Sequence, residues 1–379
     1  MFKAGTQITI LMILFCFSTV TDAGPYNQPG INGYIGSDFR HANPNDIDAV
    51  INPIFRGWAT GYKDYLPSDT IGSYGYDGIA SEYADPCKAL GSATGNEMDV
   101  VSLGDLDSTE IVDGCEPGQV TLIFGDSCNP DDPNHIRNVS GYDFVVFENG
   151  FALEYTAEDG AITGEMFAEF GYVEVSSDGE NFVRFPPVSL IPQPSGSYGY
   201  LTVDITNAYR LAGKHPNAGG VCTGTPFDLQ QLIEHPDVRS GVVDINNISY
   251  VRIVDVPGSG DFNDTAVNNI DPDTKPNWDV YNSNNPIYDA WVTWGSGGLD
   301  LEAVGVLNEQ ELSADVNLDG IVDLDDFRIL VKAWLNYFGE ENWVGRCDLD
   351  GSGDLLINFR DFAVFSTQWQ KVEQWRDYP

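Results

Sequence analysis

Oxygen-bearing side chains near the end of the chain recur at the spacing that a calcium loop requires. In residues 315–326 they occupy positions 1, 3, 5, 9 and 12, and glycine stands at position 6. Ca²⁺ takes six to eight oxygens, glycine permits the sharp turn around the ion, and position 7 offers its backbone carbonyl. We therefore predict a Ca²⁺ site formed by Asp315, Asn317, Asp319, Ile321, Asp323 and Asp326.

A second loop of this kind follows 35 residues later, since 315 + 35 = 350. Phe327 recurs at the same offset as Phe362. A repeat that preserves both metal spacing and hydrophobic anchors indicates two copies of one unit. Leu355 stands where the first copy has Gly320, so full occupancy of this loop stays open. The ligands predicted for it are Asp350, Ser352, Asp354, Leu356, Asn358 and Asp361.

Each loop precedes an apolar pattern with helical spacing. Phe327, Leu330, Val331 and Trp334 stand at i, i+3, i+4 and i+7, and Phe362, Phe365 and Trp369 repeat the pattern. We expect an amphipathic helix after each loop. The alternative is a solvated acidic tail without metal, which gives no reason for one constant offset.

Two calcium loops that are each followed by such a helix resemble a dockerin domain, the module that docks onto cohesin domains of extracellular assemblies. The resemblance covers residues 311–379 and implies a small all-α domain, with Ca²⁺ as cofactor and a cohesin-like partner. Positions 10 and 11, which face the cohesin in dockerins, are Leu324-Asp325 and Phe359-Arg360 instead of Ser-Thr. The identity of the partner therefore stays open.

Residues 1–23 have the pattern of a secretory signal peptide, with Lys3 before an apolar run and small residues at Thr21 and Ala23. An uncleaved anchor is the alternative, although the apolar run is short for a membrane span. We expect a secreted, extracellular protein without a transmembrane segment, attached to a cell surface through its partner. The formal net charge of −40 disfavours nucleic acid as a partner, because this surface repels phosphate groups.

Five cysteines follow the predicted signal, and an oxidising compartment would allow two disulfides with one thiol left over. Their pairing stays open. The absence of a Cys-x-x-Cys pair and of a Cys/His cluster disfavours zinc. The five are Cys87, Cys115, Cys128, Cys222 and Cys347.

Residues 24–310 are predicted to form a mainly β domain, a jelly-roll-like antiparallel β-sandwich, because short apolar alternations separate Gly-, Pro- and Asn-rich loops. Residues 177–180 carry the Asp-Gly signal of a hairpin turn. Residues 47–55 and 226–235 are candidates for short helices. The expected strands are 99–103, 119–124, 142–148, 172–176, 182–185, 200–205, 250–256 and 299–307.

Segments spread over residues 55–307 resemble a family of uncharacterised secreted bacterial cell-surface proteins. Among them are Tyr142-Asp-Phe-Val-Val-Phe-Glu148-Asn149, Tyr172-Val-Glu-Val-Ser-Ser-Asp-Gly179 and Leu299-Asp-Leu-Glu-Ala-Val-Gly305. Members of this family carry a C-terminal sorting signal or a dockerin. The resemblance implies a cell-surface location and brings no established activity.

Several polar residues of this domain have both a functional and a structural interpretation. Glu148 and Asn149 form a ligand or metal site at the sandwich rim, or merely a charged strand end. His215 is functional or a solvated loop residue. The acidic loop 255–289 binds Ca²⁺ or is only solvated. Aromatic residues near this loop stack on sugars or belong to the core: Trp278, Tyr281, Tyr288, Trp291 and Trp294.

These features favour a secreted calcium-binding protein whose dockerin-like domain docks a glycan- or surface-binding sandwich onto a cohesin-bearing partner. The alternative is a dockerin-tethered polysaccharide-degrading enzyme, a glycoside hydrolase with two carboxylates beside the scissile bond. A third hypothesis is a structural surface-layer component that calcium rigidifies. The sequence contains no GxSxG elbow, HExxH motif or Gly-rich phosphate loop, so it names no catalytic residue.

Overall fold

The described chain is mainly β, and its strands pair antiparallel, which confirms the expectation of a mainly β, antiparallel fold. The signal sequence predicted for residues 1–23 lies outside the described residues. Among those residues, no helix has both the length and the apolar character needed to cross a membrane. The computed structural model describes residues 24, 26, 28–37, 40–68, 71–72, 76–125, 134–152, 166–193, 203–262, 286–290, 296–310, 312–337, 342–350, 352 and 354–377.

The larger sheet is built around β19 (Asp300–Leu307), whose eight residues are all buried, as expected of a strand covered on both faces. On one side β19 pairs with β10 (Phe144–Glu148), and on the other with β8 (Val101–Ser102) and β4 (Phe55–Trp58). Beyond β10 the sheet continues through β17 (Thr223–Phe227) and β1 (Ile31–Asn32). The register shifts between Phe147 and Glu148, where β10 ends.

The second main sheet has the order β14 (Val183–Arg184), β13 (Gly171–Ser176), β18 (Tyr250–Asp255), β9 (Gln119–Ile123) and β5 (Gly61–Leu66). The predicted hairpin turn joins β13 to β14, and Gly179 adopts a positive φ of 76° there. Four short ribbons complete the strands: β2 (Tyr34–Ile35) with β3 (Val50–Ile51), β6 (Ile71–Gly72) with β7 (Tyr76–Asp77), β11 (Phe151–Ala152) with β12 (Met166–Phe167), and β15 (Val188–Ser189) with β16 (Ala208–Tyr209).

The two main sheets enclose one hydrophobic core. Val120 and Val173 of the second sheet share a buried cluster with Phe144, Val146 and Val306 of the larger sheet. Phe144 stacks on a neighbouring ring of the same cluster at a centroid distance of 5.3 Å. Burial of each such side chain contributes roughly 1.5–3 kcal/mol, so the shared core holds the sheets together.

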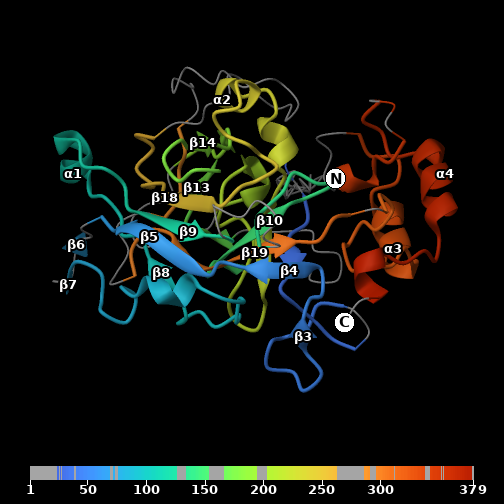
Figure 1. Cartoon of the computed structure of the whole chain (residues 1–379), viewed down its shortest axis with the longest axis horizontal. Coiled ribbons are helices and arrows are strands. Elements are labelled where there is room, and N and C mark those ends of the chain that lie inside the picture. Colours follow the sequence, from blue (N-terminus) through green and yellow to red (C-terminus); the bar gives the residue numbers. More distant parts are fainter. Residues whose placement is uncertain are drawn as a thin grey trace, which may run out of the picture.

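Helices are few and short in the sandwich and longer in the tail. Figure 1 shows α3 and α4 together at one end of the molecule, beside the strands. The sandwich has η1 (Pro86–Ala89), α1 (Ser108–Asp113), η2 (Ile205–Asn207), η3 (Leu229–Leu232) and α2 (Pro236–Arg239). The tail has α3 (Leu324–Lys332), η4 (Gly345–Cys347), α4 (Phe359–Gln368) and η5 (Gln374–Asp377).

Three of the predicted elements are wrong in whole or in part. Residues 47–55 form no helix, because Val50–Ile51 pairs with β2 and Phe55 begins β4. Within 200–205 the described Val203 makes only an isolated bridge, and the Asp204 side chain caps η2 by accepting from a backbone N–H. The candidate helix 226–235 is divided between the end of β17 and η3.

The predicted disulfides do not form among the described cysteines. Cys87, Cys115, Cys222 and Cys347 are all free, and Cys128 lies outside the described residues. Cys222 belongs to a buried cluster of the sandwich, whereas Cys347 belongs to the core of the tail. Because these two thiols serve separate cores, they are not placed to pair.

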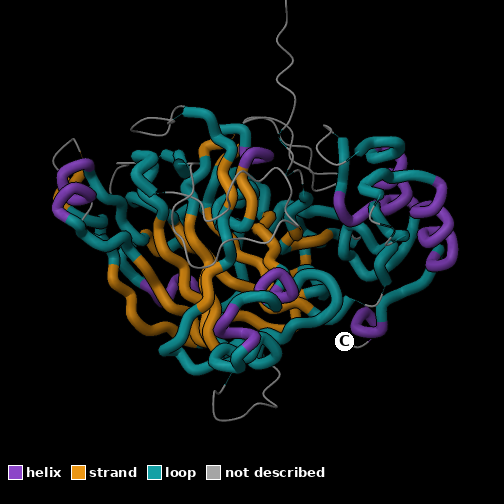
Figure 2. The backbone as a smooth tube through the Cα atoms, turned by 90° about the horizontal axis from the view of Figure 1, so that it is seen from above, coloured by secondary structure: helices purple, strands orange, loops and turns teal. Residues whose placement is uncertain are grey.

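The tail packs directly against the sandwich, and Figure 2 shows the tail helices beside the stacked strands. Leu318 of the first loop is 2% exposed and belongs to a sandwich cluster that also holds Phe55 and Phe147. Arg40 of the sandwich contacts Asp325 of α3 with an Nε–Oδ2 distance of 3.0 Å. The first loop is therefore joined to the sandwich by an apolar contact and by an ion pair.

Candidate metal centre

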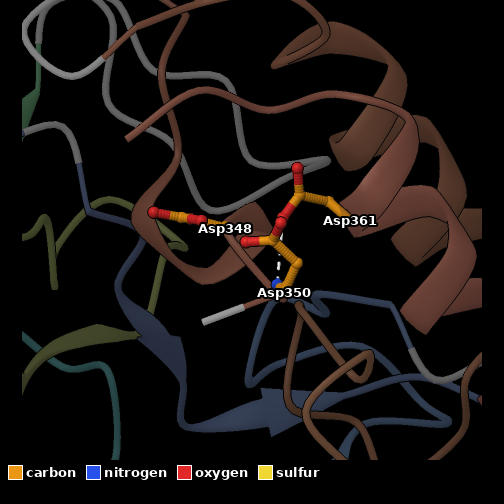
Figure 3. Close-up of side chains that lie close together, drawn as sticks. All are labelled: Asp348, Asp350 and Asp361. Atoms are coloured by element: carbon orange, nitrogen blue, oxygen red, sulfur yellow. Dashed lines mark hydrogen bonds between the residues drawn. The ribbon is translucent and has the colours of Figure 1, made fainter. Parts of the chain in front are cut away.

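Three carboxylates converge at the second loop. Oxygens of Asp348, Asp350 and Asp361 all lie within 4.8 Å of one another, and Figure 3 shows the three side chains close together. Such a group of oxygens suits a hard cation such as Ca²⁺. The spacing predicted Asp350 and Asp361 as ligands, but Asp348 lies two residues before the expected loop. The sequence signal for it was the acidic pair that Asp348 forms with Asp350.

The start of α4 places Asp361. Asn358 caps the helix by accepting the Arg360 N–H at 2.8 Å, and Asp361 completes the capping box by accepting the Asn358 N–H at 2.7 Å. The other oxygen of Asp361 accepts the backbone N–H groups of Leu349 and Asp350 at 2.7 and 3.1 Å. One buried carboxylate thus ties the beginning of the loop to the helix that follows it.

Four predicted ligands of the second loop lie outside this group of three. The Ser352 hydroxyl accepts the Asp354 N–H at 3.3 Å. Asp354 lies 3.6 Å from the Arg360 guanidinium, and the Leu356 carbonyl accepts from the Asn358 side chain at 3.0 Å. These oxygens have internal partners, and each keeps a further lone pair that could bind a metal ion.

The first loop repeats the same ties 35 residues earlier. Asp326 accepts the N–H groups of Val316, Asn317 and Asp323 at 2.8, 3.1 and 2.8 Å. Asp323 caps α3 as Asn358 caps α4. The predicted spacing therefore produces the same loop-to-helix connection twice.

The first four predicted ligands of this loop are internally hydrogen-bonded. Asp315 accepts the N–H groups of Asp319 and Gly320 at 3.1 and 2.8 Å. The Asn317 side chain also accepts from Asp319, and Asp319 accepts the Ile321 N–H at 2.9 Å. Within this fully described loop, no three carboxylates lie within 4.8 Å of one another. The carboxylate oxygens of the second loop are therefore closer together than those of the first loop.

A cation from the end of the chain approaches the first loop. The Arg376 guanidinium lies 3.6 Å from Asp319 Oδ1 and donates to the Asp319 carbonyl. Arg346 donates to the Asp315 carbonyl at 3.1 Å. These contacts offset part of the negative charge that the clustered carboxylates concentrate there.

Burial and mutual repulsion perturb the acids of the first loop. Burial, and then the charges of Asp326 and Asp319, raise the pKa of Asp315 well above its ordinary value. Burial raises the pKa of Asp319 to about 6 and that of Asp326 to about 7. Near neutral pH these carboxylates therefore hold protons more readily than ordinary ones, or require a cation.

Position 6 keeps its backbone conformation in both loops despite the change of residue. Gly320 has a φ of 86°, and Leu355 has a φ of 52°. Both values lie in the left-handed region that glycine adopts freely and leucine does not. The departure at Leu355 therefore leaves the direction of the turn unchanged.

The two copies are related by a local two-fold pattern of backbone contacts. Ile321 of the first loop bridges to Val372 after α4, and Leu356 of the second loop bridges to Tyr337 after α3. The offsets are equal, since 356 − 321 = 35 and 372 − 337 = 35. Each loop is thus held by the segment that follows the other helix, and neither copy is complete without its counterpart.

The candidate residues of the sandwich are buried. The strand end at Glu148 is 1% exposed, so it is not a solvated terminus. His215 lies 3.0 Å from Thr225 Oγ1, and burial lowers its pKa to about 3, so the expectation of a solvated loop histidine is wrong. Asp255 and Asp289 are also 1% exposed. Most of loop 255–289 lies outside the described residues, as do Trp278, Tyr281, Trp291 and Trp294; Tyr288 packs on a buried cluster.

The donor set of the tail fits Ca²⁺. It consists of carboxylate, amide, hydroxyl and carbonyl oxygens, whereas zinc and copper favour nitrogen and sulfur. In the second loop, Asp348, Asp350 and Asp361 would hold the ion. No family model, curated protein or solved structure matched the chain.

Proposed function

We propose that this chain is a calcium-dependent attachment protein, in which a dockerin-like tail docks a jelly-roll-like β-sandwich onto a cohesin-bearing extracellular partner. The observation that supports this most strongly is the duplicated loop-and-helix unit. Asp326 in the first copy and Asp361 in the second make the same hydrogen bonds from the helix to the start of the loop. Calcium orders the tail, because buried carboxylates repel one another without the ion and coordination energy becomes folding energy.

The exposed side chains of the tail favour a protein partner. Phe359 at the start of α4 is 76% exposed, and Leu324, its counterpart at the start of α3, is 52% exposed. Trp369 and Phe362 of α4 are also exposed, at 41% and 36%. Aromatic and aliphatic side chains gathered on one small helical unit are typical of a docking surface.

Hydrogen exchange of the full chain in calcium and in EDTA tests the metal requirement. We expect EDTA to abolish protection in residues 312–377 while most of the sandwich core stays protected. Tail protection that is the same in both buffers would remove the basis of the proposal. Mg²⁺ in place of Ca²⁺ serves as the control for ionic strength, since Mg²⁺ demands a tighter octahedral shell.

Binding to immobilised cohesin domains in calcium tests the attachment. Phe359→Ala is expected to weaken binding at least about tenfold, because exposed aromatic anchors dominate such contacts. The matched control is Val112→Ala, which truncates an 85% exposed side chain on α1 of the sandwich. Equal losses in both variants, or binding that persists in EDTA, would argue against docking through the tail.

A pocket on the second main sheet gives the sandwich a place for a polar ligand. It has a volume of 680 Å³, and its lining includes Tyr172, Glu174, Arg184 and Arg252. Arg184 stacks over the Tyr172 ring at 4.0 Å and contacts Glu174 at 2.7 Å, while Arg252 binds the other Glu174 oxygen. Ordered donors beside an aromatic ring suit recognition of a glycan hydroxyl or carboxylate.

Polysaccharide hydrolysis is the second candidate function, because Glu116 and Asp261 also line this pocket. Both oxygens of Glu174 are occupied by guanidinium groups, so this carboxylate is not placed as a proton donor. A screen of soluble polysaccharides separates the two functions. Turnover that Glu116→Gln abolishes would favour the hydrolase, whereas binding without turnover favours the attachment protein.

A further inference from the structure

Three acidic side chains that are distant in sequence meet at one end of the sandwich. Glu148 ends β10 of the larger sheet, Asp255 ends β18 of the second sheet, and Asp289 lies in the segment 286–290. Each of the three is 1% exposed. Burial, and then the charges of Asp255, Asp105 and Glu148, raise the pKa of Asp289 well above its ordinary value. Asp255 pairs with Gly171, and the neighbouring Phe170 donates to Asp289. Leu299 donates to Asp255 two residues before Leu301, which pairs with Glu148. Strand pairing therefore brings the three buried carboxylates to one region of the sandwich.

Each carboxylate is anchored through one of its oxygens. The second oxygens of Glu148 and Asp255, Oε1 and Oδ2, are buried and accept no hydrogen bond from the described residues. A buried acceptor left in this state costs about 1–3 kcal/mol, and more when it is charged. The anchoring backbone N–H groups are those of Gly150 to Glu148 Oε2 (3.0 Å), Leu299 to Asp255 Oδ1 (2.8 Å) and Phe170 to Asp289 Oδ2 (2.7 Å).

The groups that act on these carboxylates are mainly further carboxylates. Burial, and then the charge of Asp105, raise the pKa of Asp255. Burial, and then the charge of Asp300, raise the pKa of Glu148. Lys88 acts on Asp300, but its ammonium is already bound to the Met98 carbonyl at 2.7 Å. Buried carboxylates in this arrangement require either protons or a metal ion.

Two glycines lie directly against two of these carboxylates. A Cβ placed on Gly258 would lie 2.2 Å from Asp289 Oδ1, and one on Gly298 would lie 2.7 Å from Asp255 Oδ1. Gly298 also has a positive φ of 68°. A side chain at either position would strike a carboxylate, so both positions require glycine.

We propose that Glu148, Asp255 and Asp289 bind a second class of calcium ion, separate from the tail, that joins the ends of β10 and β18. The unpartnered Glu148 Oε1 and Asp255 Oδ2 supply the first two ligand atoms, and Asp289 supplies a third carboxylate. Oxygen donors alone favour Ca²⁺ over zinc or copper. The three carboxylates do not lie within 4.8 Å of one another, so the ion draws them together on binding.

Calcium counted per chain tests this site. In the full chain, Glu148→Gln with Asp255→Asn is expected to bind one ion fewer than the parent. The matched control is Glu302→Gln, another buried acid, on β19, whose oxygens are already bound by Thr94 and Asn217. That variant keeps the full count. A full count in the double variant, with raised stability in EDTA, would show that the acids hold protons and would overturn the proposal.

A second arm does not depend on substitutions in the sandwich. The double substitution Asp326→Ala with Asp361→Ala removes the carboxylates that connect each tail loop to its helix. It leaves the three sandwich acids intact. This full chain is expected still to bind one calcium ion and to show a calcium-dependent rise in the melting temperature of the sandwich. Complete loss of calcium binding would overturn the sandwich site, while the attachment proposal would stand or fall on the tail experiments alone.

Discussion

At position 6 of the two tail loops, two very different residues adopt the same backbone conformation. Gly320 and Leu355 both have positive φ, but only leucine carries a Cβ that this conformation crowds. The left-handed region costs a residue with a side chain roughly 1–2 kcal/mol. The second loop therefore carries a local strain that the first loop lacks.

Leu355→Gly is expected to stabilise the tail by about 1 kcal/mol, because glycine relieves this strain. Calcium binding at the second loop should tighten correspondingly. Chemical unfolding followed by tryptophan fluorescence measures the change. Gly320→Ala is the matched opposite, since its Cβ would lie 2.8 Å from the Trp375 ring and should destabilise the tail. A loss of stability in Leu355→Gly would show that the leucine side chain contributes more than its backbone costs.

The acids of the first loop would make the proposed calcium binding depend on pH. The folded pKa values of Asp319 and Asp326, about 6 and about 7, exceed the ordinary value of 3.8. Protonation therefore stabilises the calcium-free tail at low pH, and this contribution is lost as the pH rises from about 4 through 7. Calcium requires the deprotonated forms, so its affinity rises over the same interval.

Calorimetric titration with calcium at pH 5.5 and pH 7.5 tests this dependence. We expect at least about a tenfold tighter affinity at the higher pH, with protons released on binding. Repeating the titration in buffers of different ionisation enthalpy counts those protons. Asp326→Asn is the control and should flatten the dependence. A calcium affinity that is the same at both pH values would contradict the raised pKa values of Asp319 and Asp326.

At the scale of elements, the residues that cap the two tail helices are also predicted metal ligands. Asp323 and Asn358 each begin a helix, and the acid three residues later closes a capping box. The same acid also reaches back to the start of its loop. A helix and its loop therefore form as one unit in each copy.

Asn358→Ala removes the cap of α4 and is expected to destabilise the tail by about 1 kcal/mol. Far-UV circular dichroism during thermal unfolding measures the loss. Ser366→Ala, on the same helix, removes a hydroxyl that bonds only to the Ala363 carbonyl, so its effect should be within about 0.5 kcal/mol of zero. Equal effects of the two substitutions would mean that the cap contributes nothing specific.

Alternation in the sequence predicted most of the strands of five or more residues, but it missed β5 and β17. β9, β10, β18 and β19 fall within predicted ranges, and β13 begins one residue earlier than predicted. Each has at least five residues and contains β-branched or aromatic side chains. Two-residue strands such as β2 and β3 carry no period to detect. Residues 47–55 looked helical by spacing, but pairing with β2 decided their structure.

At the scale of the whole molecule, the tail and the sandwich share a hydrophobic contact. Leu318 projects from the first loop of the tail into a cluster with Ile54, Phe55 and Phe147. The loop spacing predicts candidate metal ligands but not this contact. The contact depends on residues that are more than 150 positions away in the sequence. The same holds for Glu148, Asp255 and Asp289, whose proximity follows from the pairing of strands.

Leu318→Ala is expected to destabilise the chain by about 2–4 kcal/mol, since the side chain is 2% exposed. Hydrogen exchange should rise in β4 as well as in the tail, because the cluster joins both. The control is Leu324→Ala, which alters a leucine that is 52% exposed in the same loop. Exchange that rises in the tail alone would mean that the two parts fold independently.

The contact of the tail with the sandwich adds a further difference between the two copies. Arg40 holds Asp325 of the first copy, whose side chain keeps 20% exposure, while Arg360 at the matching position of the second copy keeps 68%. A partner that recognises this position would meet an exposed Arg360 on the second copy and, on the first, a carboxylate already bound to the sandwich. The two-fold pattern would permit a partner to bind in two orientations, and the ion pair would favour one of them. Assembly through this tail would therefore be polar, with every sandwich presented in the same direction.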